Sequence, residues 1–139
     1  MQKLMIVLFV MTALTAGATY GGNEEEKSLI TPAGVRNLIK SDSSVVLLDV
    51  RTPPEFNGET GHLARAHLIP VQELEARVAE LSKFKKHTIV VYCRTGHRST
   101  AATEILLKHG FKALNMVGGI TRWRAESLPV VVEHPQEKK

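Results

Sequence analysis

Apolar residues along this chain fall into two patterns: short continuous runs, and helix-spaced positions separated by polar side chains. The continuous runs predict β-strands at residues 45–50, 66–70, 88–92 and 113–117. Runs of this kind, rich in β-branched residues, are typical of strands that are buried on both faces of a parallel sheet.

The helix-spaced positions predict helices between these strands. Thr31 is a good N-cap and Pro32 a good first helical residue, and Val35 and Leu38 follow on one face. Further helices are predicted at 71–83, at 99–109 with Gly110 as the cap, and at 120–124 after two glycines. The polar connection 51–61 contains two prolines and permits only one short turn, and 128–131 is expected to pack at an edge.

Strands that alternate with helices at this spacing predict an α/β fold in three layers, with a central, mainly parallel sheet and helices on both faces. Ligands of such sheets sit beyond the carboxyl ends of the strands. Cys93 directly follows the run 88–92 and therefore lies where a ligand is expected.

The first residues read as an export signal. Lys3 precedes the apolar run 4–14, and 16–18 has the small-x-small form of a signal peptidase site. We expect a periplasmic protein, with secretion as the alternative location and an uncleaved anchor as the alternative form. The predicted organisation is a signal peptide at 1–18, a flexible lead-in at 19–27, one folded domain at 28–131 and a mobile tail at 132–139.

Charge distribution and cysteine content limit the kinds of partner and bond that this chain can form. The formal net charge is +4, but the basic residues are scattered and do not interleave with aromatic residues, so we expect no nucleic-acid partner. We also expect no membrane association after signal cleavage. The single cysteine excludes an internal disulfide and is a reactive thiol, an intermolecular partner or a small buried hydrophobic residue.

The surroundings of Cys93 favour the reactive thiol. A tight loop that leads into a helix N-terminus offers backbone N–H groups to an anion, and Arg94 and Arg98 add positive charge. Gly96 allows the loop to turn tightly because glycine adopts positive φ without steric cost. The pattern predicts a nucleophile in an anion cradle.

Four segments in order resemble rhodanese-like domains. They are 47–51 with Glu55 and Phe56, the Gly-His to Pro segment 61–70, the loop 93–99, and 117–120 with Trp123. The resemblance covers nearly the whole of the domain predicted at 28–131. One departure is visible, because the family usually has Pro-Gly where this chain has Ala64-Arg65.

This resemblance implies a sulfurtransferase without a cofactor. Cys93 would take the outer sulfur of a small anionic donor such as thiosulfate as a persulfide and pass it to cyanide or a thiol acceptor, which can be a protein thiol. The substrate would be bound by the loop that follows Cys93, which consists of Arg94, Thr95, Gly96, His97, Arg98 and Ser99.

Loop length separates two chemistries within the superfamily. Related phosphatases and arsenate reductases have a longer loop, with five residues between cysteine and arginine, whereas only four separate Cys93 from Arg98. The smaller cradle favours sulfur. The alternatives are a noncatalytic binding module of the same fold and a phosphatase-like or arsenate-reductase-like enzyme.

Three further polar residues are expected to support the site. Asp49 and Arg51 follow a buried strand and are expected to form an ion pair or loop anchor, because buried charges are normally paired. His62 is expected to hydrogen-bond to a loop backbone, and His97 to point to solvent. Cys93 and His97 alone do not make a metal site, since three or four ligands are needed.

Overall fold

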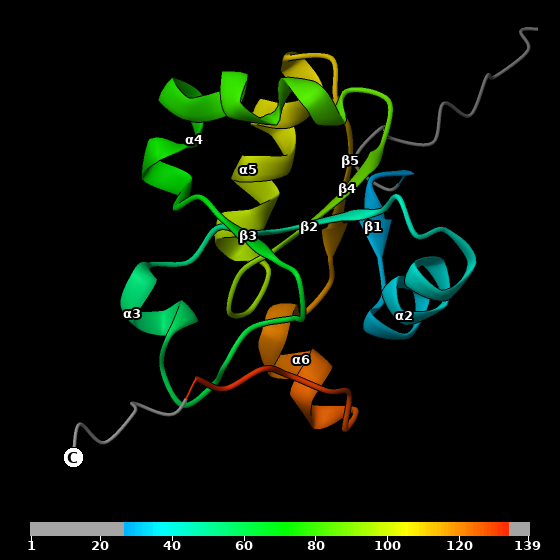
Figure 1. Ribbon diagram of the computed structural model, residues 1–139, viewed down its shortest axis with the longest axis vertical. Helices are drawn as coiled ribbons and strands as arrows, with labels where there is room; N and C mark the ends of the chain where they lie inside the picture. Colours follow the sequence, from blue (N-terminus) through cyan, green and yellow to red (C-terminus); the bar gives the residue numbers. More distant parts are fainter. Residues whose placement is uncertain (1–26, 134–139) are drawn as a thin grey trace, which may run out of the picture.

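A parallel β-sheet forms the centre of the domain in the computed structural model, which describes residues 27–133. Its five strands lie in the order β1-β5-β4-β2-β3, and every neighbouring pair is parallel (Figure 1). The strands are β1 (Leu29–Ile30), β2 (Val46–Asp49), β3 (His67–Leu68), β4 (Thr88–Tyr92) and β5 (Lys112–Met116). The predicted signal peptide, the lead-in up to residue 26 and the tail from residue 134 lie outside the described residues.

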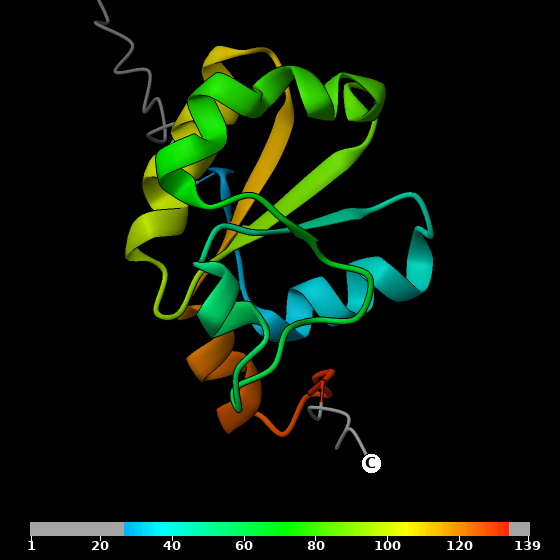
Figure 2. The same cartoon turned by 60° about the vertical axis from the view of Figure 1, so that its left-hand side comes forward.

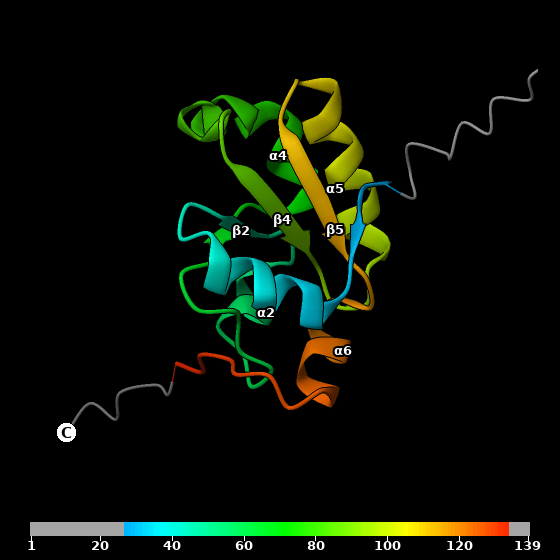
Figure 3. The same cartoon turned by 90° about the vertical axis from the view of Figure 1, so that its right-hand side faces the viewer.

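Helices cover both faces of the sheet, which confirms the predicted α/β fold. They are α2 (Pro32–Ser41), α3 (Pro53–Phe56), α4 (Val71–Arg77), the 3₁₀ helix η1 (Val78–Phe84), α5 (His97–Lys108) and α6 (Gly119–Ala125). One apolar core lies between the sheet and α4, η1 and α5, and the other lies between the sheet and α2 and α6. Figure 3 shows α2 in front of the sheet and α5 behind it.

The central strands form as the sequence predicts. Every residue of β2 is buried, and all but the first of β4 are buried, as expected for strands covered on both faces. The side chain of Thr31 caps α2 by accepting a hydrogen bond from the Gly34 N–H at 3.1 Å, and Pro32 follows it.

The predicted helix 71–83 is wrong in its second half. The α-helix ends at Arg77, and the chain continues as the 3₁₀ helix η1. Val78, Leu81 and Phe84 recur every third residue and all pack on the same core. A 3₁₀ helix has three residues per turn and keeps such a series on one face, whereas an α-helix would rotate it away.

Two edge features also differ from the prediction. The two-residue strand β1 escapes sequence analysis because it is too short to carry a period, and it is held by pairing with β5. The segment 128–131 does not join the sheet. Val131 instead forms an isolated antiparallel bridge with His62. The two backbone hydrogen bonds of this bridge have N···O distances of 2.8 and 2.9 Å.

This architecture brings several segments that are distant in the sequence to one end of the molecule. The carboxyl ends of β2 and β4, the short helix α3 and the start of α6 all lie around the loop that precedes α5 (Figure 2). Between residues 27 and 133, no helix has the length and apolar character that crossing a membrane requires.

Candidate active site

Cys93 lies at the carboxyl end of β4, and its thiol sits inside the loop that follows. The residue is only 1% exposed. Its Sγ accepts hydrogen bonds from the backbone N–H groups of Gly96 at 3.1 Å and Ser99 at 3.4 Å, and the Ser99 hydroxyl lies 3.3 Å away. The sulfur therefore faces a ring of donors, which an inert core cysteine does not need.

The loop reaches this geometry through Gly96. Its φ of 106° is in the region that favours glycine, as predicted. The helix α5 then begins at His97, two residues before the predicted start, so Arg98 and Ser99 belong to its first turn. The N–H groups of a first turn have no partner within the helix and are available to an anion.

The hydrogen bonds around the sulfur decide its ionisation. Burial is the largest single influence on the pKa of Cys93 and opposes the thiolate. The Ser99 hydroxyl and the backbone N–H groups of Ser99, Gly96 and Thr95 together outweigh it, so the pKa of Cys93 lies below its ordinary value. The site thus favours the nucleophilic form of the thiol.

The start of α6 holds the loop from behind. The N–H groups of Ile120 and Thr121 donate to the carbonyls of Cys93 and Arg94 at 2.9 and 3.0 Å. A Cβ at Gly119 would lie 2.5 Å from both carbonyl oxygens, so only glycine permits this approach. Gly119, the first residue of α6, is therefore part of the site.

The guanidinium of Arg98, which the sequence predicts to bind an anion, is already paired with a carboxylate. Its two terminal nitrogens donate to the two carboxylate oxygens of Glu55 at 2.8 and 2.7 Å. Glu55 also accepts hydrogen bonds from the backbone and hydroxyl of Thr52. The structure therefore places Arg98 in an ion pair that ties α3 to α5.

The ion pair expected at the end of β2 is present. Arg51, 1% exposed, donates through Nε and one terminal nitrogen to the carboxylate of Asp49, which is fully buried. The same guanidinium donates to the Gly61 carbonyl and the Thr60 hydroxyl. This pair anchors the connection that carries α3, and with it Glu55.

His62 makes the predicted bond to a loop backbone. Its Nδ1 lies 3.0 Å from the carbonyl oxygen of Phe56, and the two rings stack with their centroids 3.7 Å apart. The departure from the family pattern at Ala64-Arg65 also has a structural trace. Arg65 has a φ of 64°, in the left-handed region that glycine adopts without strain and that is unfavourable for a residue with a Cβ.

Arg94 is an exposed cation next to Cys93 in the loop. Its side chain is exposed and makes no ion pair within the described part of the chain. It borders a cavity of about 550 Å³ beside the loop, together with Arg51, Glu55, Thr60, Ile120 and Arg124. Thr95 and His97 are also exposed, and His97 is thus at the surface as predicted.

Sequence reasoning missed two residues of the site. Glu55 belongs to a predicted short turn and to the first family-like segment but has no predicted role in the site, although its position three residues after Thr52 forms a capping box that signals a fixed carboxylate. Asn115 carries no sequence signal, yet its Oδ1 accepts a hydrogen bond from the Ser99 hydroxyl at 2.7 Å. Across residues 27–133, no three His, Cys, Asp or Glu side chains gather as a metal site would require.

Comparison with known proteins places this geometry in a family. A family model described as the rhodanese-like domain matches residues 31–126. A sulfurtransferase of Allochromatium vinosum is 36% identical over 88 residues, which is 63% of this chain and 78% of that protein. The thiosulfate sulfurtransferase PspE of Escherichia coli is 36% identical over 73 residues, or 52% of this chain and 68% of that protein.

Solved structures agree. A rhodanese-related protein from Thermoplasma volcanium superposes with a TM-score of 0.68 at 34% identity, covering 76% of this chain and 98% of that one. Some curated relatives are much longer, and the chain spans 26% of the length of two of them. The family match, the shared fold and the cysteine loop at the carboxyl end of the sheet lead to one conclusion: this chain belongs to the family of rhodanese-like domain proteins.

Proposed function

We propose that the protein is a sulfurtransferase that carries a sulfane sulfur on Cys93. The Cys93 thiolate attacks the outer sulfur of thiosulfate, the S–S bond of the donor breaks, and sulfite leaves with its electron pair. A thiol acceptor or cyanide then attacks the outer sulfur of the persulfide and restores the thiolate. Both steps conserve charge and need no cofactor.

The observation that carries this proposal is the donor ring around Sγ. The N–H groups of Gly96 and Ser99 stabilise a negative sulfur at the bottom of the loop, and the Ser99 hydroxyl, 3.3 Å from Sγ, can turn its hydrogen toward it. Attack moves the charge outward by one sulfur atom and leaves an anion beside the same helix terminus. Donors that are already in position stabilise developing charge without reorganisation.

Two observations support thiosulfate as the donor: the positive charge of Arg94 and the name of a similar protein. Arg94 makes no ion pair within residues 27–133 and lies next to Cys93 in the chain, so it can bind the sulfonate group. PspE, one of the relatives, is named a thiosulfate sulfurtransferase. We assign sulfonate binding to Arg94 and a positioning role to Arg98.

We further propose that the protein acts after export, in the periplasm or outside the cell. The support is the sequence pattern of residues 1–18 alone. In that compartment the acceptor is a small thiol or a cysteine of a partner protein. Fractionation of the native host, with detection of the protein in the periplasmic fraction, tests this location.

Activity is tested by release of thiocyanate from thiosulfate and cyanide. The purified protein is expected to produce thiocyanate, and Cys93→Ser to produce none while keeping its far-UV circular dichroism spectrum. Full activity in Cys93→Ser would refute the proposal. Hydrolysis of an aryl phosphate by the wild type, with no thiocyanate formed, would favour phosphatase chemistry instead.

A further inference from the structure

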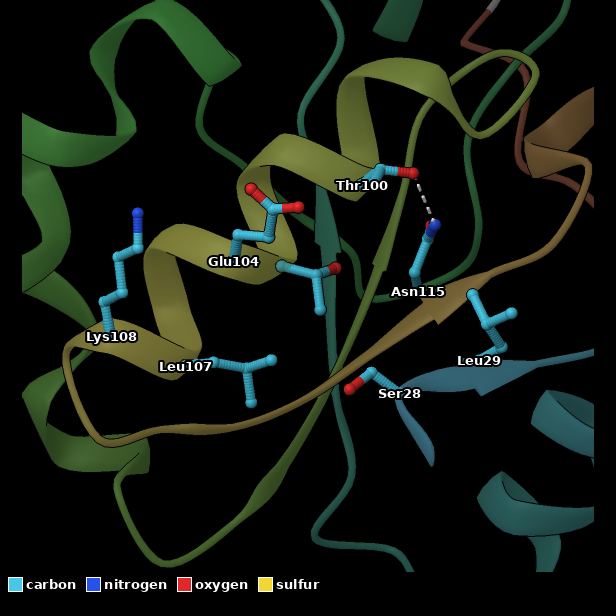
Figure 4. Close-up of a pocket in the computed structure, with 8 residues that line it drawn as sticks. Ser28, Leu29, Thr100, Glu104, Leu107, Lys108 and Asn115 are labelled. Carbon is cyan, nitrogen blue, oxygen red and sulfur yellow. Dashed lines mark hydrogen bonds between the residues drawn. The ribbon is translucent and has the colours of Figure 1, made fainter. Parts of the chain in front are cut away.

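Asn115 on β5 is buried, and both polar atoms of its side chain point into the loop region. Its Oδ1 accepts a hydrogen bond from the Ser99 hydroxyl at 2.7 Å. Its Nδ2 donates to the Thr100 hydroxyl at 3.0 Å, the contact drawn in Figure 4. The Thr100 hydroxyl in turn donates to the Gly96 carbonyl at 2.8 Å.

These contacts join Cys93 to Asn115 through a single shared proton. The Ser99 hydroxyl has one hydrogen but three acceptors within reach, namely Asn115 Oδ1 at 2.7 Å, the Gly96 carbonyl at 3.1 Å and Cys93 Sγ at 3.3 Å. A hydroxyl that donates to Asn115 can only accept from the thiol. In this orientation of the amide, the hydroxyl contact suits the neutral S–H form of Cys93, and only the backbone N–H groups of Gly96 and Ser99 favour the thiolate.

The thiolate needs this hydrogen bond in the opposite direction, from the Ser99 hydroxyl to Cys93 Sγ. Once the thiol proton leaves to solvent, Sγ can only accept, and the Ser99 hydrogen must turn toward it. A half-turn of the Asn115 amide exchanges its oxygen and nitrogen. The chain then runs from the Thr100 hydroxyl to Oδ1, from Nδ2 to the Ser99 oxygen, and from the Ser99 hydrogen to sulfur.

Space for this half-turn exists. Asn115 lies in the wall of a cavity of about 410 Å³ between α5 and the β1–β5 edge, shown in Figure 4. An amide half-turn exchanges two groups of nearly equal size. Both orientations leave the hydroxyls of Ser99 and Thr100 paired.

We propose that Asn115 is a positioning residue that reverses its amide with the charge of Cys93, so that Ser99 accepts from the thiol and donates to the thiolate or persulfide. This inference rests on the proposed role of Cys93 as the sulfur carrier. Alkylation of Cys93 by iodoacetamide reports the thiolate without any sulfur donor. A failure of the sulfurtransferase assay therefore leaves this test intact.

Asn115→Asp provides the test because a carboxylate can only accept. It should hold the Ser99 hydrogen away from sulfur and raise the midpoint of the alkylation rate against pH by about one unit, a tenfold loss of thiolate below the midpoint. The new carboxylate also raises the midpoint directly, because its negative charge disfavours the nearby thiolate. The control is Asn115→Asp in a Ser99→Ala background, which lacks the hydroxyl and keeps only this direct electrostatic effect. There the shift of the alkylation midpoint should fall to about half or less.

The charged groups packed around the loop stay unchanged in all these variants. They are Arg94 in the loop, Arg98 on α5, Glu55 on α3, Asp49 and Arg51 at the end of β2, and Arg124 on α6. Equal midpoint shifts in the two backgrounds would show that residue 115 acts by charge alone and would overturn the proposal.

A second measurement uses the native asparagine and does not depend on the folding of Asn115→Asp. The side-chain amide signals of Asn115 in ¹⁵N-labelled protein should shift with pH at the alkylation midpoint in the wild type. In Ser99→Ala that shift should be largely lost, while the backbone amide of Gly96 keeps its own. An undiminished Asn115 shift in Ser99→Ala would contradict the proposal.

Discussion

Arg65 is a residue whose backbone conformation suits a different amino acid. Its φ of 64° is left-handed, and within residues 27–133 its side chain makes no hydrogen bond or ion pair that would compensate. The left-handed conformation costs a residue with a Cβ about 1–2 kcal/mol. Substitution by glycine removes this cost, but part of the gain in stability is offset because glycine makes the unfolded chain more flexible.

Arg65→Gly is therefore expected to raise the free energy of unfolding by about 0.5–1 kcal/mol. Urea denaturation measures this change. Arg65→Ala is the control, since it removes the side chain but keeps the Cβ, and it should give no gain. Equal stability of the two variants would show that the backbone conformation carries no strain.

Glu55 links the stability of the site to pH. Its carboxylate accepts from Arg98 and, in spite of partial burial, this pairing and the Thr52 hydrogen bonds lower its pKa to about 2. A lowered carboxyl pKa stabilises the folded state fully above the unfolded value of about 4.5. This stabilisation is lost as the pH falls toward about 2.

Glu55→Gln should consequently reduce the free energy of unfolding at neutral pH, and the difference from the wild type should shrink as the pH falls from about 4.5 toward about 2. Denaturation at several pH values measures the difference. Glu59→Gln, on an exposed residue of the same connection, is the control and should show a small change at neutral pH. A difference for Glu55→Gln that stays constant to pH 2 would contradict the assignment.

Arg94→Ala tests the residue to which sulfonate binding is assigned. Loss of a charge-assisted contact is expected to raise KM for thiosulfate by about tenfold or more. The alkylation rate of Cys93 at fixed pH should change much less. Arg36→Ala, on the exposed side of α2, is the matched control. An unchanged KM in Arg94→Ala would move sulfonate binding to another group.

At the scale of the elements, the approach of α6 to the cysteine loop depends on Gly119. Gly119 and Gly110 both have positive φ, at 57° and 78°. A Cβ at Gly119 would meet the carbonyls of Cys93 and Arg94 at 2.5 Å, whereas one at Gly110 would meet only the end of the Lys85 side chain at 3.4 Å. Substitution of both glycines by alanine strains the backbone, but only a Cβ at Gly119 also clashes with the loop, so the two variants together separate the effect of strain from that of the clash.

Gly119→Ala should therefore lose more stability than Gly110→Ala, by about 2 kcal/mol, and should also lose thiocyanate production. Thermal and urea unfolding together with the activity assay measure the two effects. Gly110→Ala should remain active despite its left-handed backbone. Similar stability and activity in both variants would mean that α6 does not hold the loop.

The elements also show what a sequence pattern can and cannot predict. The runs around β2 and β4 are buried on both faces, so their composition alone identifies them. The change from α4 to η1 was missed because Leu74, Val78 and Leu81 fit an α-helical face equally well. Only the packing of Phe84 with Val78 and Leu81 shows the three-residue period.

At the scale of the whole molecule, the parts of the site that are contiguous in sequence were predictable. Cys93, Gly96 and Ser99 lie in one loop, and local geometry fixes how they meet. The Arg98–Glu55 pair and the Ser99–Asn115 pair join residues 43 and 16 positions apart. Such pairs depend on which elements the fold brings together, so one sequence does not reveal them.

The intact mass of the protein after treatment with thiosulfate tests most directly whether Cys93 carries sulfur. The wild type should gain the mass of one sulfur atom, peptide mapping should place it on Cys93, and cyanide should remove it as thiocyanate. Cys93→Ser should gain nothing. A wild-type protein that stays at its original mass in excess thiosulfate, with its thiol still open to alkylation, would show that Cys93 does not take sulfur from this donor.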